Sequence, residues 1–331
     1  MVRVVKSDAK LRLGVVGAGT MGSNHARVLA GLSGIQLVGV ADPDRAQRDL
    51  VTRVLGCPAV FDLEALLALG VDAVTIAAPT HLHHDIALTC IDRGIHVLVE
   101  KPISSTVQEG REIIAAAQQA GVTLMVGHVE RFNPAVIAIK QAIRGEDILS
   151  IAITRVGPFP PRMSNVGVVI DLAVHDIDLI RWFTESDIVE VQPQLSSAVA
   201  EREDIALLQF RTASGVLAHI NTNWLTPFKA RNVTIATRGK YLMGDLLTRQ
   251  VTECFGFQPD GAYSMRHVSV GHDEPLRAEL IAFMDAVRNG TPPAVTGEEG
   301  VASLEIATRC LESRIIPTSS VQHKGPRRVA V

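Results

Sequence analysis

Short apolar runs alternate with longer stretches of helical periodicity over the first 127 residues. The apolar runs stop at glycine, proline or an acid, and the stretches between them repeat apolar residues every three or four positions. This alternation predicts βαβ units and a parallel sheet. The predicted strands are 11–16, 35–40, 59–60, 71–78, 96–100 and 123–127, and the predicted helices are 20–32, 44–55, 62–69, 83–93 and 106–120.

The rhythm changes after Gly127, where apolar and polar residues alternate in consecutive strand-like segments. Strands without helices between them predict a mainly antiparallel sheet. The predicted strands are 148–156, 188–192, 196–199, 205–210, 216–224 and 231–236, and the predicted helices are 133–144, 168–183, 276–289 and 297–315. We therefore expect an α/β protein with a first domain over 1–127 and an α+β domain over 128–331.

Composition and charge narrow the class of protein. A chain of 331 residues, 47% hydrophobic and 20% charged, has material for two folded domains. The 32 basic against 35 acidic residues leave no cationic excess for a nucleic acid or an anionic membrane. With no signal peptide or membrane span in the pattern, a cytoplasmic protein is expected. The scattered cysteines are expected to be buried thiols: Cys57, Cys90, Cys254 and Cys310.

A glycine-rich motif follows the first predicted strand and opens the first predicted helix. Residues 17–22 read GAGTMG, which fits GxGxxG, and Asp42 ends the second strand twenty residues after Gly22. The glycines permit a tight turn and close approach to a pyrophosphate, and the acid accepts bonds from ribose hydroxyls. The pattern predicts NAD rather than NADP, because Asp42 repels a 2′-phosphate. Arg45 is the nearby cation that opposes this preference, and a turn without ligand is the alternative.

Two further segments carry candidate catalytic groups. Lys101 follows the strand 96–100, where ligands of open parallel sheets bind. The apolar helix 168–183 carries Asp171, His175 and Asp178 on one stripe, and flanking carboxylates are expected to raise the basicity of the histidine. A satisfied core histidine and a metal site are the alternatives.

Three histidines follow the strand 71–78. His81, His83 and His84 open a helix at the carboxyl edge of the sheet, and one of them is expected to reach cofactor or substrate.

Taken together, these motifs resemble the glucose-fructose oxidoreductase/inositol dehydrogenase (Gfo/Idh/MocA) family. The resemblance rests on GAGTMG (17–22), APTHLHH (78–84), VEKP (99–102) and DLAVHDID (171–178). It implies a Rossmann domain, a second domain with a large open sheet, a catalytic Lys101 with Asp171 and His175, and Pro102 in the cis form. It also implies cofactor contacts from Gly17, Gly19, Thr20, Met21, Gly22, Asp42, Ala78, Pro79, Thr80, His84, Glu100 and Lys101.

Two segments resemble the branch of that family that oxidises UDP-N-acetylglucosamine at C3. They are GHVERFNPAV (127–136) and the stretch 155–178. A diphosphate needs cationic donors, and Arg131, Arg155 and Arg162 lie in these segments. Asn133 and Asn165 are candidates for hydrogen bonds to sugar or uracil. The branch makes a 3-keto nucleotide sugar, which an aminotransferase converts to a 3-amino sugar.

The implied mechanism makes His175 the base and Lys101 the donor that stabilises the alkoxide, with Asp171 orienting the pair. The sequence leaves the exchange of the lysine and histidine roles open. Dehydrogenases of a free polyol such as myo-inositol, or of the C6-carboxylated nucleotide sugar, are alternatives. So is a dinucleotide sensor without catalysis, which the presence of Lys101 and His175 disfavours. The resemblance implies a homodimer or homotetramer.

Overall fold

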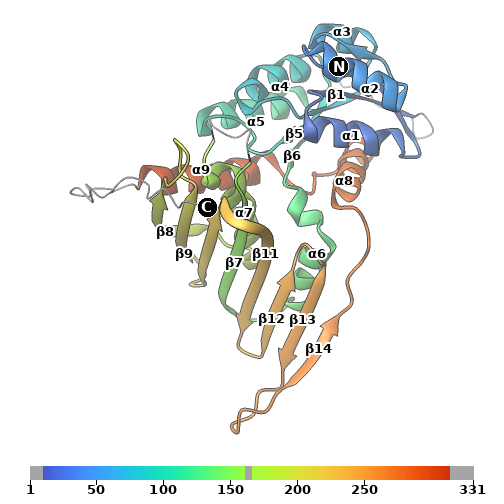
Figure 1. The fold of residues 1–331 in the computed structure, drawn as a ribbon. Helices are drawn as coiled ribbons and strands as arrows, with labels where there is room; N and C mark the ends of the chain where they lie inside the picture. Colours follow the sequence, from blue (N-terminus) through green and yellow to red (C-terminus); the bar gives the residue numbers. More distant parts are fainter. Residues whose placement is uncertain (1–9, 161–165, 314–331) are drawn as a thin grey trace, which may run out of the picture.

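The first sheet has six parallel strands, as the apolar runs predict. The computed structural model describes residues 10–160 and 166–313. The strand order is β3-β2-β1-β4-β5-β6, the doubly wound arrangement of dinucleotide-binding domains (Figure 1). The bounds are β1 (Leu11–Val16), β2 (Ile35–Ala41), β3 (Ala59–Val60), β4 (Ala73–Ile76), β5 (His96–Glu100) and β6 (Leu124–Gly127).

The helices between these strands begin and end at capping residues visible in the sequence. Asp44 and Asp62 accept bonds from the first turns of their helices, and Thr106 forms a capping box with Glu109. Gly56 and Gly121 end two helices in the left-handed region. The bounds are α1 (Thr20–Ala30), α2 (Arg45–Leu55), α3 (Leu63–Ala68), η1 (Thr80–Leu82), α4 (His83–Asp92) and α5 (Val107–Ala120).

The second sheet has eight strands in the order β14-β13-β12-β11-β7-β10-β9-β8. All neighbouring pairs are antiparallel except β7 and β10, which confirms the mainly antiparallel sheet. The bounds are β7 (Ile148–Pro158), β8 (Ile188–Ser196), β9 (Ile205–Thr212), β10 (Leu217–Asn223), β11 (Leu225–Thr237), β12 (Lys240–Asp245), β13 (Gln250–Phe255) and β14 (Ser264–Val268).

The strand predicted over 196–199 is wrong beyond Ser196, where β8 ends. The Asp204 carboxylate accepts the backbone N–H groups of Ala198, Val199 and Ala200, so a side chain takes the bonds that a neighbouring strand would need. Strands β12, β13 and β14, by contrast, were not predicted at all.

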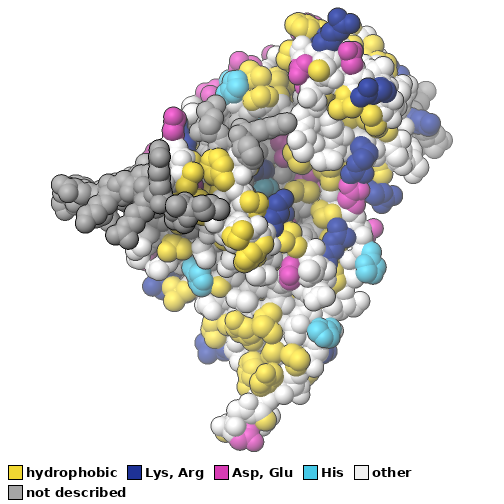
Figure 2. Space-filling model, viewed as in Figure 1, with side chains coloured by type: hydrophobic (Ala, Val, Ile, Leu, Met, Phe, Trp, Pro, Cys, Tyr) yellow, Lys and Arg dark blue, Asp and Glu magenta, His cyan; other side chains and the backbone are white. Residues whose placement is uncertain are grey.

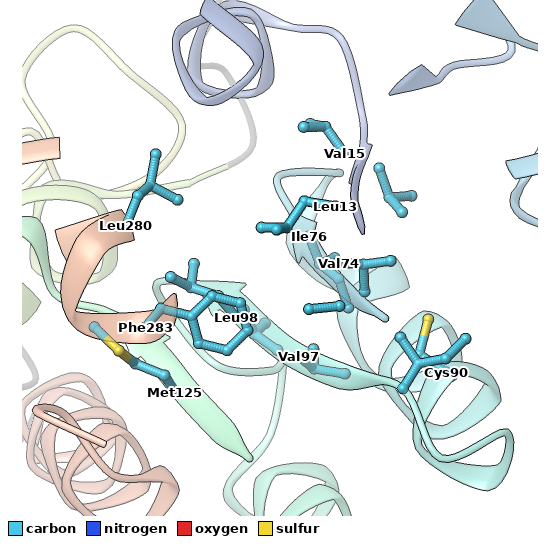
Figure 3. Packing of buried hydrophobic residues seen from close by; sticks show 14 of the residues in the cluster. Leu13, Val15, Val74, Ile76, Cys90, Val97, Leu98, Met125, Leu280 and Phe283 are labelled. Carbon is cyan, nitrogen blue, oxygen red and sulfur yellow. The ribbon is translucent and has the colours of Figure 1, made fainter. Parts of the chain in front are cut away.

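Two hydrophobic cores hold the molecule together, and the last helices connect them. The remaining elements are η2 (Val129–Phe132), α6 (Pro134–Ala142), η3 (Val169–Ala173), α7 (Val174–Thr184), α8 (Pro275–Asn289) and α9 (Gly297–Glu312). Leu280 and Phe283 of α8 belong to the core of the first sheet, where Phe283 lies beside Leu98 and Met125 (Figure 3). Helix α9 contributes residues to both cores. The C-terminal helix α8 therefore packs back on the first sheet, and α9 joins the two cores.

The four cysteines are buried and free, as expected. Within residues 10–160 and 166–313, no helix is both long enough and apolar enough to cross a membrane.

Candidate active site

The glycine loop between β1 and α1 leaves room where a dinucleotide pyrophosphate would lie. A Cβ on Gly17 would come within 2.7 Å of the Ala77 carbonyl oxygen, and one on Gly22 within 1.8 Å of the Gly17 carbonyl oxygen. A Cβ on Gly19 would meet nothing within 4 Å. The first amide groups of α1, at Thr20 and Met21, have no side-chain cap. The loop therefore packs tightly on its inner side and is open on its outer side, which fits a phosphate at a helix N-terminus.

Asp42 stands at the end of β2 beside this loop. One carboxylate oxygen accepts the backbone N–H of Ala18 at 2.6 Å, and the other accepts that of Asp44 at 2.8 Å. These bonds fix the carboxylate next to the glycine loop, where it fits the ribose hydroxyls of NAD and repels a 2′-phosphate. The side chain of Arg45 is 85% exposed and points to Asp49, so it does not compensate this charge.

Lys101, just after β5, contacts Asp171 of the helical turn η3. The ammonium Nζ lies 2.7 Å from the backbone oxygen of Asp171 and 3.2 Å from its Oδ1. The lysine side chain is 15% exposed, and the peptide bond between Lys101 and Pro102 is cis. The ammonium carries three donors, and Asp171 fixes its direction with two contacts. This arrangement holds a cation at the carboxyl edge of the first sheet, where a substrate oxygen can reach it.

His175 opens α7 immediately after a π-helical turn, η3, that contains Asp171. Such turns occur frequently at functional sites. As a whole residue His175 is partly exposed; its Nδ1 is buried without a partner, and its Nε2 makes no hydrogen bond to the described residues. Burial and the nearby charges of Lys101 and Arg155 lower the pKa of His175 well below its ordinary value. A neutral imidazole with an unbonded nitrogen can accept a proton.

The expected carboxylate partners of His175 point elsewhere. Asp171 bonds Lys101, and Asp178 bonds Arg131. The expectation that flanking carboxylates raise the basicity of His175 is therefore wrong, because burial and then the positive charge of Lys101 lower its pKa.

The loop after β4 places the histidines differently from the expectation for His84. Both ring nitrogens of His84 face carboxylates, those of Asp85 at 2.9 Å and Glu112 at 3.0 Å. His83 instead is buried, with Nε2 2.8 Å from the Ala78 carbonyl oxygen and Nδ1 3.0 Å from that of Pro102. His83 thus ties the segment Ala78–Pro79–Thr80 to the lysine loop, whereas His84 is occupied on the surface.

Glu100 offers no free carboxylate oxygen to a cofactor, contrary to the expected cofactor contact. Its Oε1 lies 2.8 Å from Nε2 of His25, and its Oε2 accepts the Lys101 backbone N–H at 3.2 Å. The side chain is turned into the protein behind Lys101.

Arg131 and Arg155 are buried in ion pairs with carboxylates of the chain, contrary to the sequence-based expectation that they face a diphosphate. Arg131 makes a bidentate pair with Asp178, with both bonds at 2.7 Å, and a further bond to Glu299. Arg155, 2% exposed, pairs with Asp176 and Glu130. In these positions they hold η2, β7 and α7 together.

The two asparagines also differ from the expectation. Asn133 caps α6 by accepting the Ala135 N–H, and its amide donates to the Leu246 carbonyl, so its polar atoms are engaged in the interior. Arg162 and Asn165 lie outside the described residues.

Arg231 is the cation that sequence reasoning missed. It lies on β11 opposite Arg155 of β7, and one of its donors contacts Glu130 at 2.8 Å. Its side chain is 36% exposed, and its charge acts on both His175 and Asp171. The outward donors of its guanidinium make no hydrogen bond to the described residues. No sequence motif marks it, and its pairing with Arg155 across β11 and β7 is a property of the folded sheet.

Fold and site together define an NAD-dependent dehydrogenase. The glycine loop and Asp42 fit NAD, and the nicotinamide ring supplies a hydride acceptor when the cofactor is bound. Lys101 follows the end of β5, at the carboxyl edge of the first sheet, and its charge acts on His175. The chain belongs to the Gfo/Idh/MocA oxidoreductase family: the NAD-binding Rossmann domain of the family matches residues 11–128, and its C-terminal domain matches residues 149–241.

Several relatives cover nearly the whole chain. The UDP-N-acetylglucosamine 3-dehydrogenase of Acidithiobacillus ferrooxidans is 30% identical over 94% of this chain and 99% of its own. Its solved structure has a TM-score of 0.85, at 29% identity over 91% of this chain and 96% of the other. Inositol 2-dehydrogenase 1 of Saccharopolyspora erythraea is 29% identical over 92% of this chain and 94% of its own. GenD2 from gentamicin A biosynthesis, in complex with NAD, has a TM-score of 0.80 at 25% identity over 95% and 96% of the two chains.

Proposed function

We propose that the protein oxidises the C3 hydroxyl of UDP-N-acetylglucosamine with NAD and yields the 3-keto nucleotide sugar for 3-amino sugar synthesis. The observation that carries the proposal is the position of Arg231. Its guanidinium is incompletely hydrogen-bonded, and its charge interacts with His175 and Asp171. A diphosphate is the part of this substrate that needs such a donor, because arginine binds phosphate oxygens with two parallel bonds. The relative from Acidithiobacillus ferrooxidans supports the same substrate.

The chain's own groups divide the chemistry. Nε2 of His175 takes the proton of the hydroxyl, because the lowered pKa of His175 keeps the ring neutral at pH 7. Lys101, directed by Asp171, donates a hydrogen bond to the same oxygen as its negative charge develops. The C–O single bond at C3 becomes the C=O double bond of a ketone as C3 gives up a hydride to the cofactor. One proton and one hydride leave the substrate, so the oxidation balances.

A free polyol such as myo-inositol is the second candidate substrate. The relative named inositol 2-dehydrogenase 1 matches at 29% identity, close to the 30% of the nucleotide-sugar enzyme. A polyol carries no phosphate, so on this alternative Arg231 would contribute little to binding. The two candidates therefore differ in what the loss of that guanidinium does.

The test is a direct comparison of substrates. Purified protein is mixed with NAD and UDP-N-acetylglucosamine, myo-inositol or UDP-N-acetylglucosaminuronic acid, and NADH is followed by its absorbance. A carbonyl-trapping amine pulls the oxidation forward, and NMR of the product locates the ketone. The proposal expects the highest kcat/KM with UDP-N-acetylglucosamine and a ketone at C3. Turnover of myo-inositol alone would refute it and favour the polyol dehydrogenase.

We propose further that the chain forms a homodimer or homotetramer through the outer face of the second sheet and works in the cytoplasm. Along β9 the inward residues are buried, whereas the outward Leu207 is 47% exposed. Apolar side chains also lie over the strands in Figure 2, and the exposed ones include Leu217, Tyr241 and Met243. Light scattering should give at least twice the mass of 35.5 kDa, and Leu207→Glu should reduce it. Four free thiols suit a reducing compartment.

A further inference from the structure

A buried acid that the chemistry above does not use lies behind the lysine loop. Glu279 of α8 is 0% exposed, and neither of its carboxyl oxygens has a hydrogen-bond partner. It faces His25 of α1 and Glu100 of β5, and one polar atom from each of the three side chains lies within 4.8 Å of the others. Its neighbour on the helix, Leu280, is packed in the apolar core (Figure 3). The acid is therefore fully buried, with an apolar core residue beside it.

The bonds of Glu100 connect this cluster to the catalytic lysine. Its Oε1 lies 2.8 Å from Nε2 of His25, and its Oε2 accepts the backbone N–H of Lys101 at 3.2 Å. Glu100 thus orients the start of the lysine loop with one oxygen and is itself fixed by His25 with the other. A change in the position of Glu100 would be passed directly to Lys101.

Ionising both Glu100 and Glu279 in this buried site would be strongly unfavourable. Burial and the negative charge of Glu100 both raise the pKa of Glu279 well above its ordinary value, so Glu279 is neutral when Glu100 is charged. The ion-paired groups of η2 do not offset this charge, since Glu130 is bound by Arg155 and Arg231, and Arg131 by Asp178 and Glu299. Within the described part of the chain, no cation is bonded to Glu279.

A metal ion is the other occupant that a His–Glu–Glu cluster suggests. Ligands about 2.0–2.1 Å from a tetrahedral zinc lie about 3.3 Å apart. The contact of 2.8 Å between His25 and Glu100 is shorter and has the length of a hydrogen bond. The spacing of His25 and Glu100 is therefore that of a hydrogen bond and not that of two zinc ligands.

We propose that Glu279 stays protonated beside the Glu100 carboxylate and acts as a positioning residue for Lys101. With that proton in place, the acid is a neutral group that packs between α8 and β5. When the proton is lost, two like charges meet in the interior, α8 and the end of β5 separate, and the Lys101 backbone loses its fixed acceptor. The proposal rests on the role assigned to Lys101 but not on the identity of the sugar.

The sign of the pH effect follows from the raised pKa. Unfolded, Glu279 ionises near its ordinary value of 4.5, whereas folded it keeps its proton to higher pH. Its contribution to stability is complete below the unfolded value and is lost as the pH rises through the folded one. Glutamine has the shape of the protonated acid and does not titrate. Glu279→Gln should therefore match the wild type most closely in acid, near the unfolded value, and exceed it increasingly as the pH rises toward the folded value.

Three measurements on the full-length protein test the proposal. Infrared difference spectra of wild type minus Glu279→Gln should show the C=O stretch of a protonated carboxylic acid at neutral pH. Thermal unfolding should become less sensitive to alkaline pH in the variant. The alkaline decline of kcat should be reduced in the variant, while KM for NAD stays unchanged. Asp285→Asn is the matched control, because it removes an exposed acid from the same helix and should change none of the three.

Other results would overturn the proposal. An absent carboxylic acid band, or alkaline unfolding profiles that are parallel in wild type and Glu279→Gln, would show that Glu279 is not a proton carrier. Elemental analysis could find a stoichiometric divalent metal in the wild type that is lost in Glu279→Gln. This result would show that the cluster binds a metal ion in place of the proton. Spectra and unfolding need no substrate, so a failure of the proposed sugar chemistry leaves these outcomes readable.

Discussion

Replacing Arg155 by methionine should strongly lower the free energy of unfolding. The substitution should have no direct effect on substrate binding. The guanidinium makes three contacts of 2.7–3.0 Å with the Asp176 carboxylate and one of 2.9 Å with Glu130. Asp176 is 0% exposed, and Arg155 supplies all the hydrogen bonds that its carboxylate receives from the described residues. Arg155→Met keeps an apolar chain of similar length and removes only the charge and its donors.

The expected loss is that of a broken buried ion pair, about 3–5 kcal/mol. For a chain of 331 residues that corresponds to a fall in Tm of roughly 4–7 °C. Burial already raises the pKa of Asp176, and Arg155 opposes that rise. Without Arg155 the acid binds a proton more readily when folded than when unfolded. The stability that this proton supplies is present at low pH and lost as the pH rises, so the deficit of the variant should shrink in acid.

Arg231→Met is the matched comparison, because Arg231 is the register partner of Arg155 and contacts the same oxygen of Glu130. Its side chain is 36% exposed, and Glu130 keeps Arg155 when it is removed. The free energy of unfolding should change by less than about 1 kcal/mol. Loss of a charge-assisted contact with the diphosphate should raise KM for UDP-N-acetylglucosamine roughly 10–150-fold.

Urea unfolding and steady-state kinetics on both variants separate the two roles. A stable Arg155→Met protein with a raised KM would refute the structural role of that arginine and restore its sequence-based assignment to the diphosphate. An unchanged KM in Arg231→Met would remove the observation that carries the nucleotide-sugar proposal.

Four further outcomes concern the cofactor and the reacting oxygen. His175→Ala should lower kcat by roughly 10²–10⁴-fold and leave NADH binding, measured by fluorescence, unchanged; weaker binding would mean a structural role. Because the pKa of His175 is lowered and its neutral form is the base, kcat/KM should be lost only as the pH falls on the acid side of 6.5. Lys101→Met should lower kcat more than it raises KM, and equal changes would speak against alkoxide stabilisation. Asp42→Ala should reduce the preference for NAD over NADP roughly tenfold or more, as measured by calorimetry, and an unchanged ratio would contradict the role of Asp42.

Much of the first sheet could be predicted because buried parallel strands are nearly continuous apolar runs. The bounds expected for β1, β3 and β5 are those of the structure. The second sheet was harder, since one of its faces is open. In β14, Ser264 to His267 are all exposed, so no apolar pattern marks the strand. Its place is set by pairing with β13, which only the folded chain supplies.

The candidate site divides along the same line. Local motifs determined the glycine loop, Asp42, Lys101 and the helix with His175, because each is a short segment whose backbone and chemistry are set within a few residues. Tertiary structure decided which cation is free and which is paired, since the partners are far apart in sequence. Arg155 and Asp176 are separated by 21 residues, and Arg131 and Glu299 by 168. Burial and the nearest charge set the behaviour of an ionisable group, and both are properties of the folded chain.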